Sequence, residues 1–205
     1  MKRGEFIQEV CRSSARGLFS LLLVATVPIV VSASSQAIAD VARSMPACAP
    51  IAQNSDAVVN GCVLALQGEN SFHSLTIING GVLTHSQNPS VDMRLALRIA
   101  TDATIDADSA ISADGLGSPY NTGLGRGYSY FDADGGGGYG GAGGDGAAGA
   151  QGGTTYGAPD SPSLLGSGGA DGGAGGGRIK LQIDGTLAVE GRISADGTVP
   201  VDVLI

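Results

Sequence analysis

An internal repeat constrains this chain more than any other feature of its sequence. Residues 94–99 (RLALRI) recur as residues 178–183 (RIKLQI), at an offset of 84 positions. After a two-residue deletion the match continues at an offset of 82, where residues 111–115 (ISADG) recur as residues 193–197. Each copy closes on an Asp-Gly pair, a turn former because glycine accepts positive φ. Short strands repeated between tight turns can stack into a solenoid, in which each rung buries the apolar face of the next.

Alternation of apolar and polar residues predicts short strands within and around the two copies. Residues 94–99 and 178–183 place an apolar side chain at every second position, as half-buried strands do, and residues 75–77 and 199–205 alternate more weakly. Between the two matching segments of each copy, Thr104-Ile105 aligns with Thr186-Leu187 at the offset of 82. No segment beyond the first forty residues shows a sustained helical period. We therefore predict an all-β fold, a short right-handed parallel β-helix or solenoid interrupted by a glycine-rich insertion. Its predicted parts are residues 58–115, the insertion 116–177, and residues 178–205.

The predicted insertion, residues 116–177, holds most of the 35 glycines of the chain. Two conformations are open to such a tract. In the first, the tract is disordered, because it buries too little apolar surface to offset the loss of backbone entropy. Alternatively, it forms close-packed extended segments of polyproline II type, which only glycine permits where backbones touch. Most of the aromatic residues of the chain interrupt the glycines, so we expect partial order.

The first forty residues read as an export signal. A basic start is followed by the apolar run 18–31 and by the small-residue pattern Ala37-Ile38-Ala39. We predict a signal peptide over residues 1–39, cleaved between Ala39 and Asp40, then a linker over residues 40–57. The protein would be secreted or held at the cell surface. No second apolar run follows, so we expect no membrane span in the mature chain.

Charge excludes one class of partner. Cleavage would leave seven basic and seventeen acidic residues, a formal net charge of −10. Nucleic acid is not an expected partner, because a basic stripe that could neutralise phosphates is missing.

Two cysteines, Cys48 and Cys62, would remain after cleavage. In an exported chain they are a plausible disulfide, worth about 3 kcal/mol by loop closure. The alternative is a pair of unbridged thiols, with Cys62 packed beside its apolar neighbours.

The order of the segments resembles a known family. Residues 75–86 (LTIINGGVLTHS), the ISADG rung, the Gly/Tyr tract, residues 165–169 (LGSGG) and residues 175–181 (GGGRIKL) follow one another, and a second rung follows them. This succession resembles the glycine-rich parallel β-helix modules of large secreted or surface-attached bacterial proteins. The resemblance covers roughly residues 72–197 and implies an adhesin-like protein, in a family that generally has no assigned catalytic residues.

Residues that could carry chemistry are few. Asp102, Asp106, Asp108 and Asp114 form an oxygen-rich stretch that could suit calcium, although surface and turn aspartates are the commoner explanation. Residues 141–146 match the GxGxxG pattern without the strand and helix that a dinucleotide site needs. No G-x-S-x-G nucleophile elbow accompanies the two histidines. We therefore expect no catalytic residue and no cofactor beyond a weak calcium candidate.

Our prediction of function is an exported, non-catalytic structural or interaction protein, adhesin-like or part of an extracellular matrix. The alternative is a carbohydrate-active enzyme, such as a polysaccharide lyase, or a carbohydrate-binding module on a β-helix. Expected partners are surface glycans or other extracellular proteins. An open rung at residues 198–205 could also pair with another solenoid. The candidate ligand contacts are the aromatic residues Tyr128, Tyr130, Tyr139 and Tyr156.

Overall fold

The computed structural model describes residues 44–86, 94–158 and 160–199, all within one compact unit, Ala33–Ile205. The predicted signal peptide, its cleavage site at Ala39 and Asp40, and residues 200–205 lie outside the described residues. The regular secondary structure of the described part is nearly all strand, with one turn of 3-10 helix, which confirms the all-β class. The elements are β1 (Asp56–Asn60), β2 (Val63–Leu66), β3 (Gly68–Phe72), β4 (Ser74–Ile78), β5 (Val82–His85), β6 (Arg94–Ile99), β7 (Ala103–Ile105), β8 (Ala110–Ser112), β9 (Ser129–Tyr130), β10 (Ala133–Asp134), η1 (Ala147–Gly149), β11 (Arg178–Ile183), β12 (Leu187–Val189) and β13 (Arg192–Ser194).

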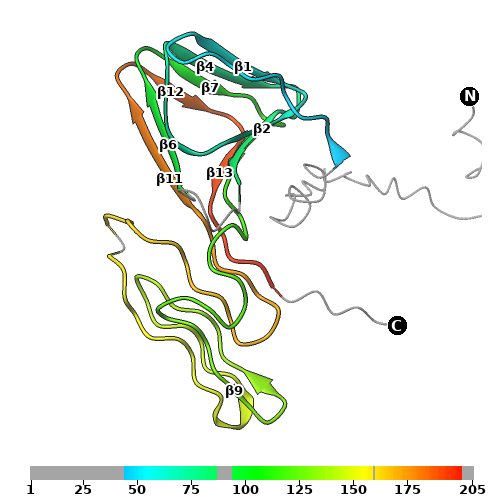
Figure 1. Cartoon of the computed structure of the whole chain (residues 1–205), viewed down its shortest axis with the longest axis vertical. Helices are drawn as coiled ribbons and strands as arrows, with labels where there is room; N and C mark the ends of the chain where they lie inside the picture. The colour runs from blue at the N-terminus through cyan, green and yellow to red at the C-terminus, as the bar shows by residue number, and fades with distance from the viewer. Residues whose placement is uncertain (1–43, 87–93, 159, 200–205) are drawn as a thin grey trace, which may run out of the picture. The chain divides into compact units, whose positions relative to one another are not determined.

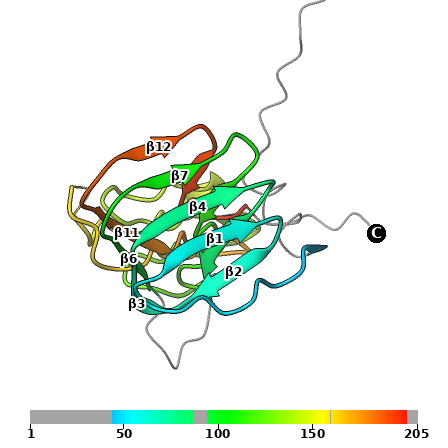
Figure 2. The ribbon, with the colours of Figure 1, turned by 90° about the horizontal axis from the view of Figure 1, so that it is seen from above.

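Three parallel sheets make up the main body. Sheet I has the order β1-β4-β7-β12, sheet II the order β2-β5-β8-β13, and sheet III the order β3-β6-β11. The chain visits sheets I, II and III in that order, and then returns to sheet I. We call each such passage a rung: β1-β2-β3, β4-β5-β6, β7-β8-β11 and the unfinished β12-β13. Figure 2 shows the strands of sheet I side by side.

The two copies of the repeat are stacked neighbours. β11 lies parallel to β6 with Arg178 opposite Arg94, which is the predicted offset of 84. The next strand corrects the sequence alignment: Thr104 pairs with Ala188, still at an offset of 84, and not with Thr186. The offset becomes 82 only at β13, where Ile193 pairs with Ile111. The two-residue deletion therefore shortens the connection between β12 and β13, where a loop can absorb it without breaking a ladder of hydrogen bonds.

Apolar side chains form columns that run across the rungs. In sheet I, Val59, Ile77, Ile105 and Val189 occupy equivalent positions of four successive strands. The first three are almost fully buried, because alternate residues of a strand point to the same face. Equivalent columns in sheets II and III complete one continuous core, and the buried members of that core are Ala57, Val59, Leu64, Phe72, Leu75, Ile77, Leu83, Leu95, Leu97, Ile99, Ala103, Ile105 and Ile111.

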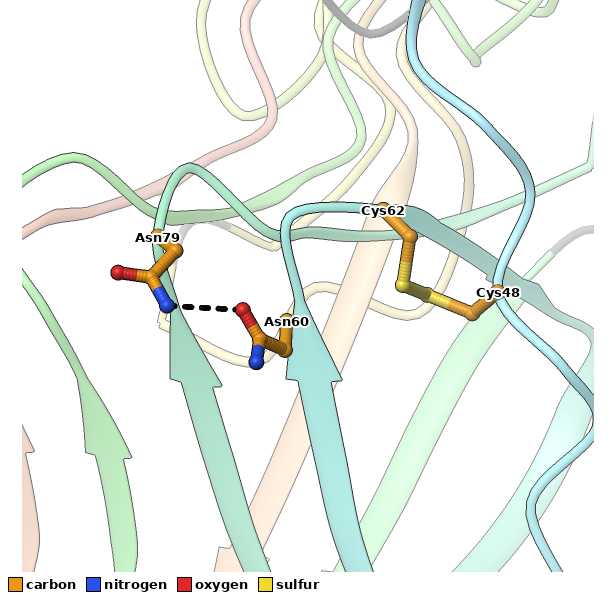
Figure 3. Close-up of a disulfide and its surroundings, with 4 residues drawn as sticks. All are labelled: Cys48, Asn60, Cys62 and Asn79. Atoms are coloured by element: carbon orange, nitrogen blue, oxygen red, sulfur yellow. Dashed lines mark hydrogen bonds between the residues drawn. A yellow bond between two sulfur atoms is a disulfide. The ribbon is translucent and has the colours of Figure 1, made fainter.

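Polar side chains stack at one corner of the rungs. The Asn79 side-chain amide donates to Asn60 Oδ1 at 2.8 Å, and the Asn79 backbone N–H donates to Asp106 Oδ2 at 2.7 Å. Figure 3 shows the asparagine pair beside the disulfide. Asn79 has a φ of 56°, a left-handed conformation that asparagine tolerates better than most residues. The three residues link three successive rungs.

The segment before β1 covers part of the first rung. Cys48 N–H donates to the Val63 carbonyl, and Val63 N–H donates to the Pro46 carbonyl, each at 2.9 Å. Cys48 and Cys62 lie at disulfide distance, with their Cα atoms 5.1 Å apart, which confirms the predicted cysteine pair. Asn54 N–H donates to the Ser71 carbonyl of β3 at 2.7 Å. Composition assigned this segment to a linker, but it packs on β2 and β3, and β1 begins two residues before the predicted boundary.

The glycine-rich tract leaves the sheets between β8 and β11 (Figure 1). Apart from β9, β10 and η1, its described residues form extended segments without regular strands, joined by backbone hydrogen bonds such as Gly153 N–H to the Gly136 carbonyl at 2.8 Å. Glycine is required because the segments touch: a Cβ on Gly153 would lie 1.8 Å from the Gly125 carbonyl oxygen. Ala150 has φ −61° and ψ 126°, close to polyproline II. The described residues of the tract are therefore closely packed extended segments.

Candidate functional site

The end of the glycine-rich tract that carries β9 lies far from the three sheets (Figure 1). Exposed aromatic residues lie at this end, in and next to β9. Tyr128, Tyr130 and Phe131 are 47%, 53% and 82% exposed. The Tyr130 and Phe131 rings meet edge to face with centroids 4.6 Å apart, and the Arg126 guanidinium lies 5.0 Å from the Tyr128 ring centroid. We call Arg126, Tyr128, Tyr130 and Phe131 the aromatic tip. Exposed aromatic groups in one place commonly mark a binding surface.

A tight hairpin presents two of these rings. β9 and β10 pair antiparallel, with Tyr130 opposite Ala133, so that Phe131 and Asp132 form the two-residue turn. Phe131 has a φ of 53°, which is uncommon for a bulky side chain, and glycine usually takes the first position of such a turn. A strained and exposed phenylalanine gains nothing from packing in a core, so the strain points to use of its ring at the surface. Sequence reasoning missed Phe131 and Arg126; the signal for Phe131 is a two-residue hairpin turn that has phenylalanine where glycine usually stands.

Close backbone packing fixes the base of the hairpin. Tyr128 N–H donates to the Gln151 carbonyl at 3.0 Å, and Gly135 N–H donates to the Tyr128 carbonyl at 3.1 Å. A Cβ on Gly127 or on Gly135 would lie 1.9 Å from the carbonyl oxygen of the neighbouring segment. The aromatic tip therefore stands on a framework whose segments cannot be spaced further apart without losing hydrogen bonds.

The other two candidate tyrosines are packed against each other. Tyr139 and Tyr156 meet edge to face with centroids 5.1 Å apart. The Tyr139 hydroxyl accepts the backbone N–H of Leu164 at 3.2 Å, and Ser167 Oγ donates to the Tyr156 hydroxyl at 2.9 Å. Burial raises the pKa of Tyr156. Tyr128 and Tyr130 are thus both exposed beside the hairpin turn, whereas Tyr139 and Tyr156 hold the loop near Leu164 to the tract.

The four candidate calcium ligands are spread over three connections: Asp102 lies between β6 and β7, Asp106 and Asp108 between β7 and β8, and Asp114 after β8. Asp102 Oδ1 accepts Thr186 N–H at 2.7 Å, and Asp114 Oδ1 accepts Asp196 N–H at 2.7 Å. In both pairs the carboxylate accepts a hydrogen bond from a backbone N–H of the next rung. Across residues 44–86, 94–158 and 160–199, no three His, Cys, Asp or Glu side chains are grouped so that they could hold a metal ion.

Asp106 Oδ2 accepts the Asn79 backbone N–H at 2.7 Å, and its carboxylate lies beside Ser109. The Ser109 side chain and the Asn79 backbone N–H lower the pKa of Asp106, because both stabilise its charged form. The fourth candidate, Asp108, is exposed.

A groove of about 780 Å³ lies between the tract and the last rung. Apolar groups such as Ile179, Ile193 and Leu164 line it, together with many glycines and the charged residues Asp134, Asp171 and Arg178. Arg178 is held in place, since its Nη1 donates to the Ser163 carbonyl at 3.0 Å. The groove is within the usual volume range of small-molecule sites, but its walls are mostly backbone and aliphatic carbon.

The GxGxxG match at residues 141–146 leads only into η1, a helix of three residues. Such a turn is too short to present the helix N-terminus that a pyrophosphate needs. No helix in the part of the chain that the structure describes is long and apolar enough to cross a membrane.

The chain matches no protein-family model, and no curated protein or solved structure is significantly similar to it.

Proposed function

We propose that this protein is an exported, non-catalytic β-solenoid module of the adhesin type, and that its aromatic tip binds surface glycans. The observation that carries the proposal is the aromatic tip itself. Three neighbouring rings are exposed there, one of them on a strained turn, and a glycine-packed framework supports them. A rigid scaffold that presents exposed side chains on a loop is the usual construction of a binding site.

The solenoid part of the proposal rests on the order of the strands. Three parallel sheets are visited in a fixed order, and apolar columns run through successive rungs. We interpret this arrangement as a parallel β-helix, right-handed like nearly all parallel crossovers. The glycine-rich tract is then an excursion from one rung, inserted between a strand of sheet II and a strand of sheet III.

The chemistry of the aromatic tip favours a neutral glycan. Aromatic faces pack on the C–H faces of sugar rings, while the Tyr128 and Tyr130 hydroxyls remain able to hydrogen-bond. Polyanions are disfavoured, because the chain without its predicted signal peptide carries a formal net charge of −10. Arg126 supplies one positive charge beside Tyr128, which is too little for a polyanion site.

A glycan array probed with the exported protein tests the proposal. Binding to a set of neutral glycans is expected, and each of Tyr130→Ala and Phe131→Ala should weaken it by about 3-fold to 10-fold. Tyr120→Ala is the matched control, because Tyr120 is an equally exposed tyrosine elsewhere on the tract. Glycan binding that survives removal of both tip rings would contradict the role of the tip. Binding to no glycan would contradict the partner class.

A separate observation favours the enzymatic alternative, namely the groove that Asp171 and Arg178 help to line. A carbohydrate-active enzyme would release oligosaccharides from the glycans that the array identifies. Chromatography of those glycans after long incubation separates the two functions: cleavage that Arg178→Ala abolishes would replace the binding proposal with an enzymatic one.

A further inference from the structure

Among the described residues, no further rung packs on the outer side of β11, β12 and β13. β11, β12 and β13 are the outermost strands of sheets III, I and II in the described part of the chain. Their inward side chains continue the core columns, but Leu187, Val189 and Ile193 are 41%, 43% and 37% exposed. The residues one rung below them, such as Ile105 and Ile111, are at most 2% exposed. We call the surface of β11, β12 and β13 the open end.

The opposite end of the stack is different. Residues 46–48 lie along the outer edge of β2, and residues 53–55 bond to β3 and to the residue that follows it. Ile51 packs against the core there, and the Cys48–Cys62 disulfide holds the segment. Two of the three strand edges at this end are thus already covered by the same molecule. A head-to-tail stack that continues all three sheets is blocked, so copies cannot add indefinitely in one direction.

The open end is complementary to itself. β11 and the residue after it read Arg-Ile-Lys-Leu-Gln-Ile-Asp over residues 178–184, with a positive charge at one end and a negative charge at the other. Two antiparallel copies centred on Leu181 would place Arg178 opposite Asp184 of the second copy. The same register aligns the apolar Ile179 with Ile183. Opposite charges and apolar groups directly across an antiparallel pair are stabilising.

The same two-fold rotation also pairs the outermost strands of the other two sheets. A two-fold axis through the Leu181 pair exchanges sheets I and II, which brings β12 of one copy beside β13 of the other. With Val189 opposite Ile193, Glu190 faces Arg192 across the contact. These charges already have partners within one copy: Arg178 Nη1 donates to the Ser163 carbonyl, Arg192 pairs with Asp114 and Asp196, and Asp184 lies 3.8 Å from Arg98. The Arg98–Asp184 and Arg192–Asp196 pairs are partly exposed, which leaves room for a further contact.

We propose that the open end binds a second copy of this chain, end to end, in a closed two-fold dimer with antiparallel pairing of all three sheets. The contact covers the exposed members of the apolar columns and pairs strand edges that otherwise invite aggregation. It also covers Ile179 and Ile193, which line the groove. The inference does not depend on glycan binding, because the aromatic tip lies elsewhere on the molecule.

Light scattering on the exported, oxidised protein tests the dimer. A dimer is expected over concentrations of about 1 to 100 µM, and Val189→Lys with Ile193→Lys should convert it to a monomer. These positions are already exposed, so the variant should fold, and circular dichroism checks that it does. Val58→Lys is the matched control, because Val58 is half exposed on β1 at the opposite end. Tip variants such as Phe131→Ala should remain dimeric.

A charge exchange tests the register. Arg178→Asp alone should weaken the dimer by about tenfold or more, because two like charges then face each other twice. Adding Asp184→Arg restores opposite charges across the two-fold axis and should restore dimerisation. A wild-type monomer at every concentration would overturn the proposal. An open-ended series of oligomers would overturn it in favour of head-to-tail stacking, and failure of the double exchange to rescue would overturn the register.

Discussion

Gly135 gives the sharpest test of how the glycine-rich tract is held together. A Cβ at this position would lie 1.9 Å from the Gln151 carbonyl oxygen, about 1.5 Å inside the 3.4 Å at which ordinary contact begins. Either the Gln151 segment or the Gly135 segment must therefore move by roughly that distance. The Gln151 carbonyl accepts Tyr128 N–H at 3.0 Å, so moving it breaks this bond.

The cost of Gly135→Ala follows from the hydrogen bonds at stake. Gly135 itself donates to the Tyr128 carbonyl at 3.1 Å and accepts Ala170 N–H at 3.0 Å. Loss of two or three backbone bonds at about 1 kcal/mol each lowers the free energy of unfolding by about 2–3 kcal/mol. In a chain of this size that loss corresponds to a fall of about 5–10 °C in Tm.

Gly144→Ala is the matched control, because a Cβ at Gly144 would meet nothing within 4 Å. Its effect should be neutral, or stabilising by up to about 1 kcal/mol, since alanine restricts the unfolded chain. Thermal unfolding of both variants measures the difference, and hydrogen exchange over residues 125–138 locates it. Equal Tm values for the two variants would refute the argument that backbone contact, rather than flexibility, requires glycine in this tract.

Two further predictions concern the solenoid body. The lowered pKa of Asp106 means that its carboxylate stabilises the fold above the unfolded pKa of about 3.9, and that this stabilisation is lost as pH falls through the folded pKa. Asp106→Asn should therefore flatten the dependence of Tm on pH below about pH 4, with Asp108→Asn as the control for one lost charge; an unchanged acid profile would contradict this. Replacing Cys48 and Cys62 by serine should lower the free energy of unfolding by about 3 kcal/mol, measured by urea denaturation. Hydrogen exchange should then rise first in residues 46–55, and exchange that rises elsewhere instead would show that the disulfide does not hold this end.

The repeat shows which strand pairings can be predicted by comparing the two copies in the sequence. Matching residues 94–99 to residues 178–183 identified two strands that lie in register, because equal side chains occupy equal places in neighbouring rungs. The position of the deletion was wrong, since Thr186-Leu187 resembles Thr104-Ile105 as well as the true partner Ala188-Val189 does. The ladder of hydrogen bonds decides between them, and a ladder exists only once both strands are placed.

The exposure of the aromatic residues, in contrast, could not be predicted from the sequence. Tyr128 and Tyr156 stand in the same kind of glycine-rich sequence, yet one is on the surface and the other packs on Tyr139. Nothing local distinguishes them, because burial in an extended segment depends on which other segment passes beside it. Phe131 was detectable in principle, as a bulky residue in a two-residue turn, but only after the pairing of β9 with β10 was known.

Sequence alone determined the all-β class and the cysteine pair. Each of these follows from composition or from the period of side chains along one chain. The tertiary structure decided which glycines touch, which tyrosines face outward, and that the core columns end exposed at Leu187, Val189 and Ile193. These are relations between segments far apart in sequence, and their energies come from contacts that the chain makes only when folded.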